Sequence, residues 1–267
     1  MRPLVMGVLN VTPDSFSDGG RWLDPEAAVA HGLRMVAEGA DVIDVGAEST
    51  RPGAEPVTVD EELRRIVPVV RALAGQTRVS IDTRKAEVAE AAIAAGATLV
   101  NDVSASLAPV AAAGGVGWVA MHMQGDPRTM QQAPAYDDVV AEVTAFLVEH
   151  ASSAGVDEVW IDPGIGFGKT LAHNLALLAH IDALVATGYP VVIGTSRKRF
   201  LGTLLAVADA LPPGETVSVG DRLEGSVATA AWAMWHGAGM VRAHDVRASV
   251  LTAEMVGQAH DERSRGT

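Results

Sequence analysis

The sequence predicts an α/β fold, a closed (β/α)8 barrel of the TIM type that forms a single domain. Three observations support this prediction: eight short apolar stretches recur along the 267 residues, amphipathic stretches separate most of them, and six of the eight follow a glycine. Strands that are apolar on nearly every residue indicate a parallel sheet covered by helices. Eight such units in this length favour the closed barrel, although the pattern alone leaves an open doubly wound sheet as the alternative.

The first unit carries clear end signals. LVMGVLN (4–10) is the first predicted strand, and the apolar spacing of 25–39 predicts a helix. Asp24 and Pro25 suit the N-cap and the first position of that helix, and Gly39 suits its left-handed end. Strand and helix therefore alternate from the start of the fold.

The later units repeat this order. The second strand lies within 38–50, and a capping box of Thr58 and Glu61 marks a helix start before the third strand, RVSIDTRK (78–85). The spacing of 85–96 predicts the next helix, and Gly96 and Gly155 also suit helix ends. The last five strands lie within the glycine-led stretches 95–104, 114–126, 154–164, 187–198 and 236–246. Residues 208–221 are predicted to form a long surface loop, and residues 260–267 a frayed tail.

Composition excludes several classes of function. With 48% hydrophobic residues the chain can bury a large core, and its length fits one large α/β domain or two small ones. A net charge of -13 disfavours nonspecific binding to nucleic acid or anionic membranes. Without cysteine there is no disulfide, thiolate nucleophile or cysteine metal site. No apolar run reaches the roughly 20 residues of a membrane span, so a cytoplasmic protein is expected.

Polar residues stand where the predicted strands end, and in a parallel barrel these ends share one mouth. They are Asn10, Asp44, Glu48, Asp82, Asn101, Asp102, His122, Gln124, Asp162, Ser196, Lys198, Arg242 and His244. Any single Asp or Asn here could merely cap the next helix. Asp82, Asn101 and Asp162 offer acceptors for a flat, donor-rich ring, whereas Arg51, Lys198, Arg242 and His244 suit a phosphate or carboxylate. The set as a whole predicts a ligand with a donor-rich heterocycle at one end and an anion at the other.

Three familiar motifs are absent. GIGFGKT (164–170) has three residues, not four, between its first glycine and the final Gly-Lys, so it is not a phosphate-binding P-loop. No G-x-G-x-x-G follows the first strand, which removes the support for dinucleotide binding. His122, His173 and His180 form no recognisable metal triad.

Several long stretches resemble one family, dihydropteroate synthase. They are MGVLNVTPDSFSDGG, DVGAESTRPGA, SIDTRK, NDVS, HMQGDPRTMQ, DPGIGFGKT, GTSRKRFLG and RAHDV, in family order between residues 6 and 246. The resemblance implies a (β/α)8 barrel that condenses 6-hydroxymethyl-7,8-dihydropterin pyrophosphate with p-aminobenzoate, giving dihydropteroate and pyrophosphate in folate biosynthesis. It also implies a sulfonamide target, because these drugs mimic p-aminobenzoate, and a homodimer.

The resemblance also implies a role for each matching residue. Asp82, Asn101, Asp162 and Lys198 match the pterin site. The pyrophosphate pocket corresponds to Asn10, Thr50, Arg51, Arg242 and His244, with Asn10 also a ligand of Mg2+. Residues expected at the p-aminobenzoate site are Phe16, Pro52, Phe167, Lys198 and Arg199. Those expected to take part in catalysis are Asp18, Arg51, Lys198, Arg242 and His244.

The loop NVTPDSFSDGG (10–20) makes a poor strand and a poor helix. In the family this loop closes over the pterin pyrophosphate, which implies that it excludes water and that Phe16 walls the p-aminobenzoate pocket. Asp18 would face the positive charge that develops as pyrophosphate leaves. The implied course is SN1-like, with pyrophosphate leaving before the aniline nitrogen adds, assisted by Mg2+.

One position departs from some relatives. Where they have Ser after the lysine of the S-R-K motif, this chain has Arg199, so the hydroxyl contact to the p-aminobenzoate carboxylate is absent. Two other functions are compatible with the same barrel: a pterin-binding methyltransferase of the corrinoid-dependent type, and a noncatalytic pterin-binding paralogue. The first needs no pyrophosphate pocket, and RAHDV, SRKRF and the complete first loop argue for that pocket.

Overall fold

A computed structural model describes residues 2–12, 25–48 and 56–265 of the chain. The strands are β1 (Leu4–Asn10), β2 (Val42–Gly46), β3 (Arg78–Asp82), β4 (Leu99–Asp102), β5 (Gly117–Met121), β6 (Val159–Asp162), β7 (Val192–Ile193) and β8 (Met240–Ala243). The helices are α1 (Pro25–Ala37), α2 (Val59–Leu73), α3 (Ala86–Ala95), α4 (Ala108–Gly114), α5 (Val139–Ser153), α6 (Leu171–Ala179), α7 (Ile181–Val185), α8 (Arg199–Ala208), α9 (Leu223–Trp235) and α10 (Val246–Arg265), with a 3-10 turn, η1 (Val219–Asp221), before α9.

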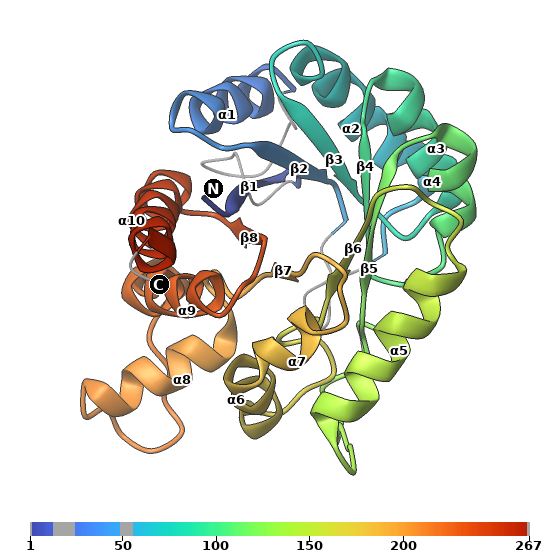
Figure 1. Ribbon diagram of the computed structural model, residues 1–267. Coiled ribbons are helices and arrows are strands. Elements are labelled where there is room, and N and C mark those ends of the chain that lie inside the picture. Colours follow the sequence, from blue (N-terminus) through green and yellow to red (C-terminus); the bar gives the residue numbers. More distant parts are fainter. Residues whose placement is uncertain (1, 13–24, 49–55, 266–267) are drawn as a thin grey trace.

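The eight strands form one parallel sheet that rolls into a barrel inside a ring of helices (Figure 1). The strand order is β6-β5-β4-β3-β2-β1-β8-β7. A single parallel bridge between Ile161 and Val191 joins the two ends of this order, and Ile161 N donates to Pro190 O at 3.0 Å. The predicted closed barrel is therefore confirmed, and the open doubly wound sheet is excluded.

Two apolar cores hold the barrel, one inside it and one between the sheet and the helices. The inner core is a layer of Met6, Val42, Leu99, Val119, Trp160, Val192 and Met240, contributed by seven of the eight strands. The outer core surrounds it, because successive strand residues point to opposite faces and both faces are covered. This explains why the strands are apolar on nearly every residue.

The predicted helix ends can be compared with the structure. Pro25 is the first residue of α1, and Gly39, Gly96 and Gly155 have positive φ angles, as predicted. The capping box at α2 is only half formed: Thr58 Oγ1 accepts from Glu61 N, but the Glu61 carboxylate pairs with Arg64 and Arg65. A nearby guanidinium outcompetes the backbone N–H for that carboxylate.

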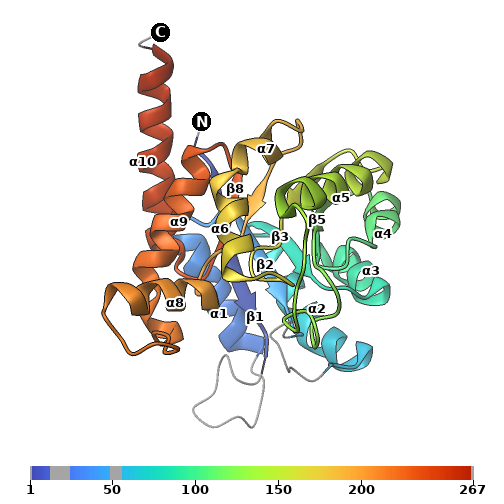
Figure 2. The same cartoon turned by 90° about the horizontal axis from the view of Figure 1, so that it is seen from below.

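The C-terminal end differs from the prediction of a frayed tail over 260–267. Residues 260–265 continue α10, which projects past its neighbour α9 (Figure 2). Near this end, the ring of His260 stacks on that of Trp235 at 4.7 Å, a contact with α9 that the sequence pattern did not reveal. Among the described residues, no helix has the length and apolar character to cross a membrane.

Candidate active site

A buried cluster of charges lies at the carboxyl ends of β2, β3, β4 and β8. Arg242 donates through Nε to Asp44 Oδ2 and through Nη2 to Asp82 Oδ2, both at 2.6 Å. Asn101 Nδ2 donates to the same Asp44 oxygen at 2.9 Å. One guanidinium therefore connects three strand ends that the sequence separates by up to 198 positions.

Burial sets the electrostatics of this cluster. The Asp44 side chain is fully buried, and its Oδ1 has no hydrogen-bond partner among the described residues. Burial raises the pKa of Asp82 to about 7, against the opposing effect of Arg242, and the neighbouring Asp44 raises it further. Although burial by itself would lower the pKa of Arg242, Asp44 and Asp82 raise it, so the guanidinium stays charged.

A second cluster lies beside the first, at the ends of β6 and β7. Asp162 is 4% exposed, and its Oδ1 accepts from Gly164 N at 2.7 Å. Lys198 Nζ donates to Ile165 O and lies 4.8 Å from the ring centre of Phe167. Burial lowers the pKa of Lys198 to about 8, while Asp162 opposes that shift. Conversely, burial raises the pKa of Asp162, and Lys198 is the main opposing charge.

Gly194, which follows β7, brings the two clusters together. A Cβ atom built on it would lie 3.7 Å from both Arg242 Cβ and Lys198 Nζ. A side chain here would fill the space next to the two cations. Asp44, Asp82, Asn101, Asp162, Lys198 and Arg242 thus surround one region of the mouth.

The remaining predicted residues lie around this region. His244 follows β8, and both its backbone N and its Nδ1 lie 3.1 Å from Ser196 Oγ. Asn10 ends β1, and its side chain is partly buried. Arg199 begins α8 and is exposed, so it lies at the outer edge of the mouth.

Five predicted site residues lie outside the described residues: Phe16, Asp18, Thr50, Arg51 and Pro52. The same holds for most of the loop 10–20 and for the N-cap Asp24. Their roles remain predictions from the resemblance.

Some strand-end residues have other partners. The fully buried Asp102 accepts from Ser104 N, Ser106 N, Leu107 N and Trp118 Nε1, so it caps the turn after β4. Gln124 pairs with the backbone of Ala135. For Asp102 the capping role, which the sequence left open for each Asp or Asn, is the observed one.

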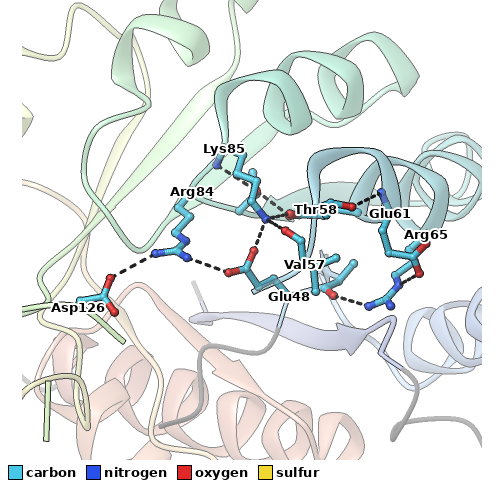
Figure 3. Close-up of polar contacts among 11 residues, drawn as sticks. Glu48, Val57, Thr58, Glu61, Arg65, Arg84, Lys85 and Asp126 are labelled. Carbon is cyan, nitrogen blue, oxygen red and sulfur yellow. Dashed lines mark hydrogen bonds and ion pairs between the residues drawn. The ribbon is translucent and has the colours of Figure 1, made fainter. Parts of the chain in front are cut away.

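Glu48 belongs to a network beside the mouth (Figure 3). Lys85 Nζ donates to Glu48, to Glu62 Oε2 at 2.5 Å and to Val57 O at 2.8 Å. Arg84 adds contacts to Glu48 at 3.1 Å and to Asp126 at 3.7 Å. Glu62 is fully buried, and it also accepts from Thr83 Oγ1 at 2.8 Å. This network connects the ends of β2 and β3 to α2.

The structure modifies the predicted separation of acceptors for a ring from cations for an anion. Arg242 lies among the acceptors, because the fully buried Asp44 requires a cation. Asp44 appeared in the sequence only as one polar strand end, without an assigned role. The feature of the sequence that could have revealed the role of Asp44 is its position as an acidic residue in the middle of the apolar strand VIDVG.

Comparisons with known proteins identify the family. The family model described as pterin binding enzyme matches residues 6–244. Dihydropteroate synthase of Mycobacterium leprae is 54% identical over 95% of this chain and 92% of its own length, and that of Escherichia coli is 44% identical over 95% and 90%.

Solved structures give the same result. A Yersinia pestis dihydropteroate synthase in complex with a sulfonamide drug superposes with a TM-score of 0.88 at 43% identity, covering 97% of this chain and 95% of that one. A Xanthomonas albilineans dihydropteroate synthase with 4-aminobenzoic acid gives 0.86 at 48% identity, covering 97% and 93%. The same enzyme in complex with 7,8-dihydropteroate gives 0.83 at 46% identity, covering 97% and 94%. The chain therefore belongs to the pterin-binding enzymes and, within them, to the dihydropteroate synthases, which are transferases of folate biosynthesis.

Proposed function

We propose that the mouth of this barrel joins 6-hydroxymethyl-7,8-dihydropterin pyrophosphate to p-aminobenzoate and releases 7,8-dihydropteroate and pyrophosphate. The observation that carries the proposal is the cluster of Asp44, Asp82, Asn101, Asp162, Lys198 and Arg242 around Gly194. Relatives that bind p-aminobenzoate or dihydropteroate share this barrel at more than 40% identity.

The pterin ring is held by Asp82, Asn101, Asp162 and Lys198. Asp82 and Asp162 accept from ring N–H groups, and Asn101 can both donate and accept. These carboxylates are desolvated before the ligand arrives, as their raised pKa values indicate. Donors on the ring would restore hydrogen bonds that burial removed, so a donor-rich edge is favoured over an apolar one.

The pyrophosphate is held by Asn10, Arg242 and His244, together with Thr50 and Arg51. Arg242 offers a charged donor, and His244 stands on the following turn beside Ser196. The chain carries a net charge of -13, which repels anions overall. The cationic side chains at this end of the barrel must therefore supply the local attraction for the pyrophosphate.

Mg2+ fits this pocket through Asn10. No cluster of three or more His, Asp or Glu that could hold a metal occurs among the described residues, whereas Mg2+ in phosphate sites uses one or two protein oxygens together with phosphate oxygens. The side-chain oxygen of Asn10 at the end of β1 is such a hard ligand. When bound, the ion would neutralise charge on the leaving pyrophosphate.

The order of bond changes follows from charge. The pterin ring stabilises a methylene cation, so the carbon–oxygen bond to pyrophosphate breaks first and the aniline nitrogen then adds to the carbon and loses a proton. Arg242, Arg51 and His244 stabilise the departing anion, and Asp18 faces the cation. No protein nucleophile is needed.

The aniline substrate occupies the outer part of the mouth. Phe167, beneath the Lys198 ammonium, offers an aromatic wall, and Phe16 and Pro52 add to it. Arg199, at the start of α8, can pair with the carboxylate of p-aminobenzoate in place of the serine of some relatives.

Membership of the dihydropteroate synthases argues against the two other functions compatible with the barrel, a noncatalytic paralogue and a pterin-binding methyltransferase. The decisive assay is release of pyrophosphate with both substrates and Mg2+ present, for the wild-type protein and for Arg242→Ala. We expect a loss of at least about 100-fold in the variant, because a charged donor to the leaving group is removed. Arg247→Ala, which alters an exposed arginine on α10, should behave like the wild type.

Since Arg242→Ala also leaves the fully buried Asp44 and the partly buried Asp82 without their cation, its fold is checked by circular dichroism and its melting temperature. Equal product formation by folded Arg242→Ala and by the wild type would remove the proposed anion pocket. Methyl transfer from a folate without pyrophosphate release would favour the methyltransferase.

We further propose a homodimer located in the cytoplasm. Large apolar side chains are exposed on the last two helices, with Trp232 and Trp235 on α9 and Leu251 and Met255 on α10. Exposed apolar surface of this kind is typical of protein interfaces.

A further inference from the structure

The lysine of the glycine-rich segment GIGFGKT is buried, unlike a lysine that binds phosphate at a surface loop. Lys169 is 3% exposed, and its Nζ lies 2.9 Å from His122 Nδ1. It also donates to Phe167 O at 3.0 Å. Within the part of the chain that the structure describes, no carboxylate lies within 4.0 Å of this ammonium.

A buried ammonium without a carboxylate partner is costly, and apolar replacements of buried charges are often more stable. Burial accordingly lowers the pKa of Lys169 to about 7. When Lys169 is charged it can only donate, so the imidazole of His122 then accepts through an unprotonated Nδ1 and carries its proton on Nε2. Burial, and then Lys169, lower the pKa of His122 to about 3, which agrees with that state.

The glycines explain how Lys169 reaches this position. Gly164, Gly166 and Gly168 have φ angles of 64°, 85° and 60°. A Cβ on Gly164 would lie 1.9 Å from His122 O, and one on Gly168 would lie 2.5 Å from Gln124 O. Only glycine permits both the left-handed backbone and this close approach. The segment after β6 is thereby pressed against the segment after β5, and Lys169 connects the two.

Phe167 stands at the centre of this arrangement. Its carbonyl accepts from Lys169 on the buried side, and its ring lies beneath the ammonium of Lys198 on the open side. A chain of contacts therefore runs from His122 through Lys169 and Phe167 to Lys198, across the segments that follow β5, β6 and β7.

We propose that Lys169 is a positioning residue that fixes the Phe167 wall and so sets the affinity for the aromatic amine substrate. The inference rests on the proposed contact between Phe167 and p-aminobenzoate. Lys169 is not among the groups proposed to contact substrate, so removing it should displace the wall and affect the pterin site only through Asp162, whose pKa Lys169 lowers less than Lys198 and Arg242 do.

The test measures the KM of each substrate separately for Lys169→Met, which keeps the length of the side chain without its charge. We expect the KM for p-aminobenzoate to rise on the order of tenfold, because small displacements of a positioning group cost this much or more. The KM for the pterin pyrophosphate should change by less than about threefold, and the melting temperature should equal or exceed that of the wild type. A merely structural role would instead lower the melting temperature and disturb both KM values.

Three further variants complete the design. Thr170→Ala is the matched control: it weakens the cap of α6 at the neighbouring residue, where Thr170 Oγ1 accepts from His173 N at 3.2 Å, and should leave both KM values unchanged. His122→Gln disturbs the Lys169 contact from the other side, and it should raise the KM for p-aminobenzoate in the same direction. Phe167→Ala tests directly whether the Phe167 ring contributes to binding of p-aminobenzoate.

The outcomes separate the two proposals. Suppose that Phe167→Ala raises the KM for p-aminobenzoate but that Lys169→Met and His122→Gln leave it unchanged. Lys169 then has no positioning role, and the proposed contact between Phe167 and p-aminobenzoate is retained. If Phe167→Ala changes nothing, the proposed contact and this inference fail together. A rise in the pterin KM alone in Lys169→Met would also overturn the inference, because Lys169 would then act through the charge on Asp162, whose pKa it helps to lower.

Discussion

At the scale of single residues, Asp44 illustrates how burial dictates partners. A carboxylate with no exposed surface must be paired or neutralised, and Arg242 is the cation that reaches it. The same guanidinium pairs with Asp82, which still has 22% of its side chain exposed to the mouth. Asp44 therefore orients Arg242, and Asp82 is left as the carboxylate that a ligand can reach.

The raised pKa of Asp82 predicts how pterin affinity depends on pH. Only the ionised carboxylate accepts two ring N–H groups, and this group ionises at about pH 7. We expect affinity for 6-hydroxymethylpterin to fall about tenfold per pH unit below 7, measured by calorimetry between pH 5.5 and 7.5. This ligand carries no phosphate, so ionisation of pyrophosphate does not contribute.

Asp82→Asn is the control, because it cannot titrate and should give a flat profile over this range. A wild-type profile as flat as that of Asp82→Asn would contradict the prediction.

The pH affects stability in the opposite direction from binding: raising the pH through about 7 strengthens binding of the pterin but removes the contribution of Asp82 to the stability of the fold. The folded protein holds this proton more tightly than the unfolded chain, so the contribution of Asp82 to stability is full below about pH 3.8 and is lost as the pH rises through about 7.

Neighbouring residues show what a sequence can and cannot specify at this scale. Asn101 and Asp102 both end β4, yet Asn101 joins the charge cluster and Asp102 caps the next turn. Adjacent strand residues point to opposite faces, so one of the two had to face away from the barrel interior. Which one depends on the stagger of the strands, and that is set by pairing across the whole sheet.

At the scale of elements, the network of Lys85 predicts a large effect on stability. Lys85→Met leaves Glu62, which is fully buried, with the Thr83 hydroxyl as its one side-chain donor among the described residues. Breaking a buried ion pair on one side costs about 3–5 kcal/mol, so we expect urea unfolding to show a loss of this size.

The matched control is Arg64→Met on the same helix, α2. Arg64 is 65% exposed and pairs with Glu61, so its loss should change the free energy of unfolding by less than about 1 kcal/mol. Equal effects of Lys85→Met and Arg64→Met would show that the buried network contributes no more than a surface pair.

The type and order of the elements could be predicted because each strand is apolar on both faces and several helices carry end signals. The division of residues 171–185 into two helices, α6 and α7, could not be predicted from the sequence, because both helices are apolar and no glycine or proline marks the break at His180. The Lys85 network was also missed, because its members come from β2, α2 and the end of β3, which only the fold brings together.

At the scale of the whole molecule, the exposed apolar residues of α9 and α10 lead to a test of the proposed dimer. Met255 and Leu251 are 74% and 53% exposed on α10. We expect sedimentation velocity to give twice the mass of one chain, and the double variant Leu251→Glu, Met255→Glu to give one chain mass, since buried charges oppose association. Leu33→Glu on α1 should leave the dimer intact. A wild-type protein that sediments as a single chain would contradict the proposal.

The fewest residue pairs of the barrel join β6 to β7, and the neighbouring strands β7 and β8 share only two. Five residue pairs join β1 to β2, whereas the Ile161–Val191 bridge alone joins β6 to β7. Asp162 and Gly194 flank this joint, next to the space between Lys198 and Arg242. We therefore expect the barrel to widen more easily here, beside the proposed pterin site, than between β1 and β2, because fewer main-chain hydrogen bonds would have to change.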